Sequence, residues 1–344
     1  VVFFLYMMYN RAWRLFMKTK AQKVLEEYML FNIRKTDMSS EKTTMSTHLY
    51  GTMVIALAMD SEFKLSNDFS NLLKKILLGV QDYDSKNDIL MLKYEIMEYA
   101  LSKELSRTSN IEEVYENTKK LFGSRSESQC KNVIKFFKHN MVLHEKKRSG
   151  WDSKHFDVSG KVETVSDHVY STMKLADAIN KHYNLDVNID KVLKMLLVHE
   201  FGEILIGDIT PFDNVTVEEK ESIEHKAFKN VVSMLSNREE LYNLMIEFDE
   251  HTTKESKFAY MCDKLEAPLQ AKVYFDKGRF KELNEYTNNV VLTDPEIKKF
   301  IKNGASNAYH IWYFYNIGLI NDEIYKDIIL TSKYTNTNLK KAYR

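Results

Sequence analysis

The sequence predicts a nearly all-α protein. Only three prolines and ten glycines occur in 344 residues, and Leu, Lys, Glu, Met and Tyr are abundant, a composition that favours helices. Hydrophobic residues make up 44% of the chain, which is enough to bury one large core or two cores of ordinary size. We therefore expect helices packed around one or two cores, and we take them in chain order.

The first nine residues, VVFFLYMMY, resemble a targeting segment only superficially. They lack a basic region and are far shorter than the roughly 20 residues that a membrane span needs. We expect them to be the first turns of a helix that runs through Leu15 and packs on the body. Membrane insertion and secretion are not expected.

A segment of the first half reappears 120 residues later without a gap, which predicts an internal duplication. The identical pairs are Thr44 and Thr164, Ser46 and Ser166, His48 and His168, Tyr50 and Tyr170, Thr52 and Thr172, Met53 and Met173, Ala56 and Ala176, and Ala58 and Ala178. The same shift pairs Leu73, Lys74, Leu77, Asp88 and Ile89 with Leu193, Lys194, Leu197, Asp208 and Ile209. Between Phe122 and Ser128, one glycine and several serines break the helical pattern, so we place the join there.

The second half contains three helices that carry isolated polar residues. A helix begins near residue 164, with Ser166 or Asp167 as its N-cap and His168 in its first turn. The apolar run 192–198 predicts a core helix that leads into His199 and a group of acids. Asp263 interrupts the apolar stripe of a third helix, 258–266. Since a lone buried carboxylate costs several kcal/mol, each of these residues needs a partner, and one divalent ion would serve them all.

His199 is followed by Glu200, Glu203 and Asp208 in the stretch VHEFGEILIGDI. His199 and Glu203 are four residues apart, so on a helix they share one face. This arrangement outlines a metal site. A solvated final turn with a chance histidine is the alternative interpretation of the segment.

The C-terminal part is predicted to add further helices. Thr293 or Asp294 caps a helix that has Pro295 at its first position. The aromatic run 309–315 contains no interleaved Lys or Arg, so we expect it to lie in the core or at a domain interface, in preference to stacking on bases. The polar tail 331–344 is expected to be loosely ordered.

The order His168, then His199 with Glu200, then Asp263 resembles the pattern H, H-D, D of the HD-domain phosphohydrolases. The segments VSDHVYSTMKLA, HEFGEILIGDITP and YMCDKLEAPLQA resemble in particular the branch that removes phosphate from nucleoside 5′-monophosphates, often deoxynucleotides. The resemblance covers about residues 145 to 285. One departure stands out: the H-D dyad of the family is His199-Glu200 here, and the extra methylene moves the carboxylate.

The resemblance implies an HD-domain helical fold and a role for each site residue. His168, His199, Glu200 and Asp263 would bind one divalent transition metal, Mn²⁺, Fe²⁺, Co²⁺, Ni²⁺ or Zn²⁺, since two imidazoles and two carboxylates suit these ions. Three further roles concern catalysis and the substrate: a proton donor for the leaving 5′ oxygen (Glu203), an acid that orients the attacking water or the sugar (Asp208), and a phosphate-binding cation (Arg148).

The first half is predicted to be a degenerate copy of the active unit. Gly79 and Val80 stand where His199 and Glu200 would be, and neither side chain can bind a metal. We therefore predict a degenerate domain over 1–125, an HD phosphohydrolase domain over 126–290 and a helical extension over 291–344. The two copies would form an internal pseudo-dimer, and assembly into a homo-oligomer stays open.

The charge and the cysteine content limit which binding partners and which cellular compartment are expected. The formal net charge is zero, so no global field draws the chain to nucleic acid or to an anionic membrane, and neither partner is expected. Cys130 and Cys262 are the only cysteines and are too few for a disulfide framework, which is consistent with the reducing cytoplasm.

Two other functions remain open besides a phosphomonoesterase that acts on nucleoside 5′-monophosphates. One is hydrolysis of another nucleotide phosphate, such as a nucleoside triphosphate or a guanosine tetraphosphate alarmone. The other is a non-catalytic regulator that binds a nucleotide or a metal, in which Glu200 marks a lost activity.

Overall fold

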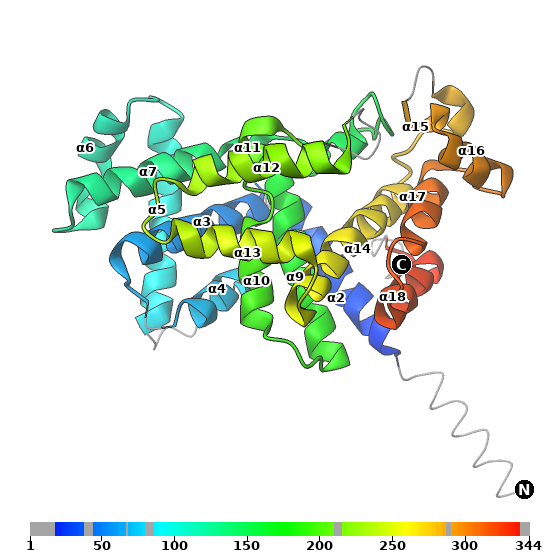
Figure 1. The fold of residues 1–344 in the computed structure, drawn as a ribbon, viewed down its shortest axis with the longest axis horizontal. Coiled ribbons are helices and arrows are strands. Elements are labelled where there is room, and N and C mark those ends of the chain that lie inside the picture. Colours follow the sequence, from blue (N-terminus) through cyan, green and yellow to red (C-terminus); the bar gives the residue numbers. More distant parts are fainter. Residues whose placement is uncertain are drawn as a thin grey trace, which may run out of the picture.

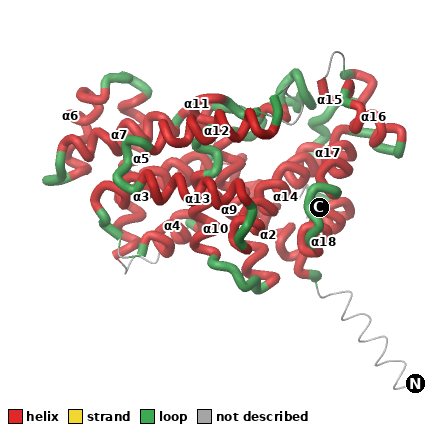
Figure 2. The backbone as a smooth tube through the Cα atoms, viewed as in Figure 1, coloured by secondary structure: helices red, strands yellow, loops and turns green. Residues whose placement is uncertain are grey.

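The computed structural model describes residues 18–37, 44–66, 68–79, 86–209, 215–286 and 290–337. Within these ranges every extended regular element is a helix, and β pairing is limited to an isolated antiparallel bridge between Lys147 and Thr164 (Figure 2). The all-α prediction is confirmed. The expected N-terminal helix through Leu15, Val80 and residues 338–344 of the polar tail lie outside the described residues. The tail was expected to be loosely ordered from residue 331, but its start belongs to a helix that ends at Tyr334.

The first half forms five described helices, which occupy the blue to cyan part of Figure 1. They are α2 (Lys20–Asp37), α3 (Met45–Phe63), α4 (Phe69–Leu78), α5 (Lys86–Leu105) and α6 (Ile111–Phe122). Helix α3 is buried along most of its length because α5 packs on one side of it and helices of the second half pack on the others. Helix α6 ends at Phe122, and Gly123 follows with a φ of 66°, so the predicted helix break is confirmed.

The second half supplies the helices that surround the candidate site. They are α7 (Glu127–Asn140), α8 (Val142–Glu145), the 3₁₀ turn η1 (Ser149–Trp151), α9 (Val165–Tyr183), α10 (Ile189–Val198), α11 (Glu203–Ile206), α12 (Val217–Val232), α13 (Arg238–Glu250) and α14 (Lys254–Asp276). Helix α9 packs against α2, α3, α10 and α14, so it is the centre of the fold. Its N-cap is Thr164, which forms a capping box with Asp167, so the prediction of Ser166 or Asp167 as the cap was wrong by two or three residues.

The chain ends in a group of short helices at the right of Figure 1. They are η2 (Leu283–Glu285), α15 (Val290–Thr293), α16 (Pro295–Lys302), α17 (Ala308–Ile317) and α18 (Glu323–Tyr334). Asp294 caps α16 and Pro295 starts it, as predicted. In the aromatic run, Tyr309 and Tyr313 are buried and the Trp312 ring lies 5.1 Å from that of Trp151, so this run belongs to the interior.

Two helix pairs correspond between the halves. Helices α3 and α9 are both 19 residues long, with N-caps Thr44 and Thr164 and left-handed C-caps Lys64 and Asn184. Helices α4 and α10 are both 10 residues long and begin after Asp68 and Asn188. Each cap therefore lies 120 positions from its counterpart. Corresponding helices also pack on each other, α3 on α9 and α4 on α10.

Two smaller predictions can be compared with the described residues. Cys130 and Cys262 are both free thiols, as expected from the lack of a disulfide framework, and both are buried. Among the described helices, none combines the length and the apolar composition that crossing a bilayer requires. The cytoplasmic location and the three domain boundaries stay predictions.

Candidate metal centre

Three helices bring the four predicted ligands together. His168 lies in the first turn of α9, His199 and Glu200 directly follow α10, and Asp263 lies within α14. One ligand atom from each of the four residues lies within 4.8 Å of the others. Residues separated by 95 positions in sequence thus meet at one buried point, near the centre of Figure 1 where α9, α10 and α14 approach one another.

The two imidazoles are oriented as metal ligands. The Nδ1 atom of His199 lies 2.7 Å from the carbonyl oxygen of Leu196. Because a carbonyl can only accept, Nδ1 carries the proton, and the lone pair of Nε2 points into the cluster. Among the described residues, this buried Nε2 has no hydrogen-bond partner. Nε2 of His168 likewise faces the carboxylates, 3.0 Å from Asp263 and 3.6 Å from Glu200. A divalent cation would satisfy these atoms, so the residues present fit a metal.

The local backbone differs from the continuous helix that the four-residue spacing suggested. Helix α10 ends at Val198, and residues 199–202 form a turn before the single turn of α11 begins at Glu203. The amide of Glu203 donates to the carbonyl of Glu200, three residues back, so the segment stays coiled although it leaves the α-helical pattern. The turn keeps Glu200 and Glu203 close to the same arginine, Arg148.

The cluster holds its carboxylates ionised. Burial raises the pKa of Glu200, but the adjacent His199 and Arg148 outweigh it and lower this pKa to about 2. Burial also raises the pKa of Asp263, yet Lys264 and the hydrogen bond from His168 hold it well below the usual range. Ionised carboxylates are the form that binds a cation.

Arg148 joins three acids of the site. Its Nη1 atom lies 3.1 Å from Glu200, 3.3 Å from Asp208 and 3.8 Å from Glu203. The backbone bridge between Lys147 and Thr164 anchors this arginine beside the start of α9. The predicted phosphate-binding cation therefore lies against the metal cluster, and its side chain is only 19% exposed.

Asp208 is held by the segment that carries Arg148. Its Oδ2 atom accepts a 2.6 Å hydrogen bond from the amide of Ser149, whose hydroxyl donates to the Asp208 carbonyl at 2.8 Å. Gly207 ends α11 with a φ of 95°, a conformation that favours glycine and turns the chain toward Ser149. In this arrangement Asp208 positions Arg148.

Glu203 has the environment of a proton donor. Its side chain is 4% exposed, and burial together with Glu200 and Asp208 raises its pKa well above the usual range. A raised pKa favours the protonated acid, which is the form that can donate a proton. Its Oε2 atom has no hydrogen-bond partner among the described residues, so this oxygen is available to a bound molecule.

Sequence reasoning missed several residues next to the cluster. Glu266 accepts a hydrogen bond from Nδ1 of His168 at 2.9 Å, and Lys264 lies 2.9 Å from Asp263. Glu266 follows Asp263 by three residues, so its place on the same face of α14 was a usable signal. Nothing in the sequence pointed to Tyr28, which contacts Glu266 from α2.

The corresponding place in the first half has a different chemistry. Nδ1 of His48 lies 2.5 Å from Glu98, and this hydrogen bond raises the pKa of His48. Gly79, the counterpart of His199, ends α4 with a φ of 63°. Among the described residues, no group of metal-ligating side chains forms around His48.

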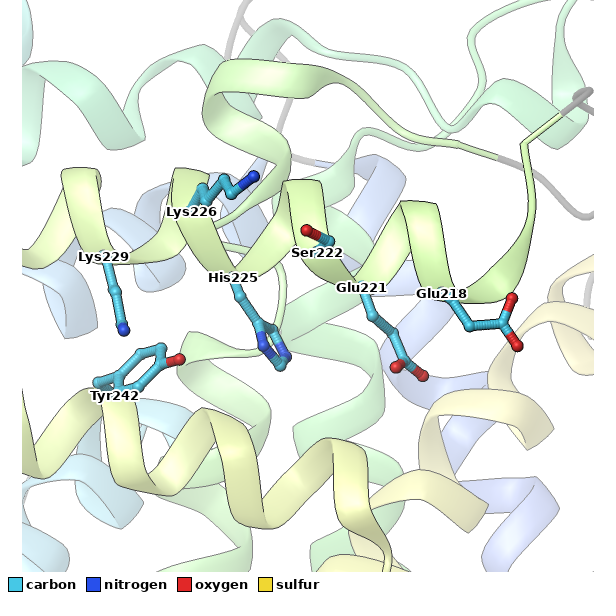
Figure 3. A pocket seen from close by; sticks show the side chains of 7 residues that line it. All are labelled: Glu218, Glu221, Ser222, His225, Lys226, Lys229 and Tyr242. Carbon is cyan, nitrogen blue, oxygen red and sulfur yellow. The ribbon is translucent and has the colours of Figure 1, made fainter.

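A hollow of about 430 Å³ lies on the surface between α12 and α13 (Figure 3). Its lining includes Glu218, His225, Lys229 and Tyr242. His225 pairs with Asp249 at 2.6 Å, and the Lys229 ammonium lies 4.0 Å from the centre of the Tyr242 ring. None of the lining residues belongs to the four-residue cluster.

Comparison with known proteins gives the family. The sequence profile described as "HD domain" matches residues 142–303. The mouse 5′-deoxynucleotidase HDDC2 is 31% identical over 180 residues, which cover 49% of this chain and 84% of the relative. The Dictyostelium discoideum protein of that name is 33% identical and aligns over 42% of this chain and 77% of its own.

Two further proteins are similar over a comparable part of the chain. The 5′-deoxynucleotidase YGK1 of Saccharomyces cerevisiae is 31% identical over 46% of this chain and 75% of its own. The crystal structure of the PH0347 protein from Pyrococcus horikoshii OT3 aligns with 58% of this chain and 98% of its own, at a TM-score of 0.41 and 24% identity. The HD-domain profile and the 5′-deoxynucleotidase relatives, together with the H, H-E, D cluster, show that the chain belongs to the HD-domain phosphohydrolase family.

Proposed function

We propose that the protein is a metal-dependent phosphomonoesterase that removes the phosphate from nucleoside 5′-monophosphates, in particular deoxynucleoside 5′-monophosphates. The observation that carries the proposal is the meeting of His168, His199, Glu200 and Asp263 at one buried point. The relatives are 5′-deoxynucleotidases of animals, a slime mould and yeasts, and this supports the substrate class.

One divalent transition metal would be held by these four residues, through Nε2 of each histidine and an oxygen of each acid. When bound, it would act as a Lewis acid on the phosphoryl group and lower the pKa of a water, two effects that phosphate-ester hydrolysis needs. The protein itself orients His199 through the Leu196 carbonyl and keeps Glu200 ionised beside Arg148. Mn²⁺, Fe²⁺, Co²⁺, Ni²⁺ and Zn²⁺ all suit this donor set.

Arg148 and Glu203 would act on the substrate. The Arg148 fork can bind two phosphate oxygens at once, and Asp208 with Ser149 fixes its position beside the cluster. Glu203, whose pKa is raised by burial and by its acidic neighbours, would donate a proton to the leaving 5′ oxygen. A phosphate bound at Arg148 would lie near both Glu200, a proposed metal ligand, and Glu203, the proposed proton donor.

We also infer that the two halves arose by duplication and form an internal pseudo-dimer. The equal lengths and matched caps of α3 with α9 and of α4 with α10 support this inference. So does the packing of each helix on its own counterpart, because a two-fold interface brings equivalent surfaces together. The first half would serve as scaffold, with the active unit in the second.

A nucleotide panel tests the proposed activity. We expect release of inorganic phosphate from deoxynucleoside 5′-monophosphates in the presence of Mn²⁺ or Co²⁺, and none from the matched 3′-monophosphates. Phosphate and pyrophosphate would be measured for 5′-monophosphates, triphosphates and guanosine tetraphosphate with each metal. Faster hydrolysis of a triphosphate or of the alarmone would replace the proposed substrate, and nucleotide binding without any turnover would favour a regulator.

A further inference from the structure

Tyr28, a residue of the first half, contacts the carboxylate that supports one of the proposed metal ligands. Its hydroxyl donates to Oε1 of Glu266 at 2.9 Å, and Oε2 of the same carboxylate lies 2.9 Å from Nδ1 of His168. Glu266 and His168 are fully buried, and Tyr28 is 3% exposed. Tyr28 lies on α2, which packs against α9 and is outside the part of the chain that matches the HD domain.

We infer that Tyr28 is a positioning residue for the metal centre, acting through Glu266 to fix the ring of His168. A carboxylate can only accept, so Nδ1 of His168 donates to Glu266 and Nε2 is left facing the other ligands. Carboxylate partners of this kind orient metal-binding histidines and raise their basicity. The hydroxyl of Tyr28 in turn holds Oε1 of the same carboxylate, so Tyr28, Glu266 and His168 form one hydrogen-bonded series.

The neighbouring groups favour a hydrogen-bonded support over a second metal site. Glu163, His168 and Glu266 also offer ligand atoms within 4.8 Å of one another. However, the indole of Trp151 donates to Glu163 at 2.9 Å, and Tyr28 donates to Glu266. Nδ1 of His168 would have to lose its proton to bind an ion there. We therefore expect one metal ion in each chain.

The inference rests on the proposed metal site, and its test uses the full-length chain with metal binding as the readout. Tyr28→Phe removes only the hydroxyl and should weaken Co²⁺ or Zn²⁺ binding by about 3- to 10-fold in a chelator competition. Glu266→Gln, which alters the direct partner of His168, should weaken it by about 10- to 100-fold. The double variant should bind the metal only slightly more weakly than Glu266→Gln alone, because Tyr28 acts through Glu266 in one series of hydrogen bonds.

Tyr170→Phe is the matched control. Tyr170 is a buried tyrosine of α9 whose hydroxyl donates to the Leu77 carbonyl at 2.8 Å, away from the ligands. Both Tyr→Phe variants remove only a buried hydroxyl, and the Tyr28 hydroxyl also lies 3.4 Å from Oε1 of Gln270. Thermal unfolding of the metal-free chains should therefore change similarly, whereas only Tyr28→Phe should change metal affinity. Equal metal affinity in Tyr28→Phe and the parent, or an equal loss in Tyr170→Phe, would overturn the inference.

A measurement on the unchanged protein covers the case in which Tyr28→Phe does not fold. Histidine NMR of the Zn²⁺-loaded parent should show a proton on Nδ1 of His168 that is protected from exchange, and an unprotonated Nδ1 would contradict the inference. The metal content of Asp263→Ala distinguishes failure of the proposed metal site from failure of the inference about Tyr28. If Asp263→Ala retains the metal, the proposed site is wrong. If Asp263→Ala loses the metal and Tyr28→Phe binds it like the parent, the site is correct but Tyr28 does not support it.

Discussion

Glu200→Ala is expected to abolish phosphatase turnover, whereas Glu200→Asp is expected to retain or raise it. The metal needs a carboxylate at this position, and the aspartate restores the geometry of the H-D dyad that the resemblance implies. Loss of one ligand removes several kcal/mol of transition-state stabilisation, so turnover should fall by about a thousand-fold or more. The measurement is phosphate release from a deoxynucleoside 5′-monophosphate at saturating metal.

Glu218→Ala is a suitable control for this substitution. Glu218 is an exposed acid of α12 on the surface hollow of Figure 3, so its loss changes the net charge equally without touching the cluster. Its turnover should match the parent. If Glu200→Ala hydrolyses the nucleotide as fast as the parent, Glu200 is not a metal ligand. That result would favour the alternative of a regulator that binds a nucleotide or a metal.

A fragment that begins near Ser128 is expected to be poorly soluble or unfolded. It lacks α2 and α3, which pack on α9, so it uncovers buried residues such as Tyr170, whose ring lies 4.9 Å from that of Phe31 on α2. Each large apolar side chain that loses its burial costs about 1.5 to 3 kcal/mol, while a whole domain is stable by only about 5 to 15 kcal/mol. Circular dichroism and size-exclusion chromatography of the fragment would measure the effect, and a soluble, fully active monomer would show that the first half is an independent module.

His48→Ala tests whether the first half contributes to catalysis or serves only as a scaffold. His48 pairs with Glu98 and lies outside the metal cluster, so metal content and turnover should stay almost unchanged. A large loss of turnover in a folded His48→Ala protein would show that the first half takes part in the reaction directly.

The helices and the ligand cluster could be predicted from the sequence because both depend on local patterns. Buried polar residues such as His168 and Asp263 interrupt apolar stripes, and this conflict is visible without a structure. The prediction of the N-cap was wrong because Thr164 and Ser166 are both good capping residues, and the choice depends on where Asp167 closes the capping box.

Long-range contacts could not be predicted in the same way. Tyr28 and Glu266 are 238 positions apart, and a tyrosine on an apolar helix face gives no sign that its hydroxyl has a buried acceptor. The hydrogen bonds from Ser149 to Asp208 were missed for a similar reason, because they depend on the direction that the chain takes after the turn at Gly207. These contacts follow from packing between elements and not from the residues of one element.

The central claim is that one divalent ion is bound by His168, His199, Glu200 and Asp263. Its most direct test is metal analysis of the parent, of Asp263→Ala, and of Asp276→Ala, a matched change on the same helix at an aspartate that pairs with Lys272. The proposal predicts about one ion per chain in the parent and in Asp276→Ala, and loss of the ion in Asp263→Ala. Equal metal content in Asp263→Ala and the parent would contradict it.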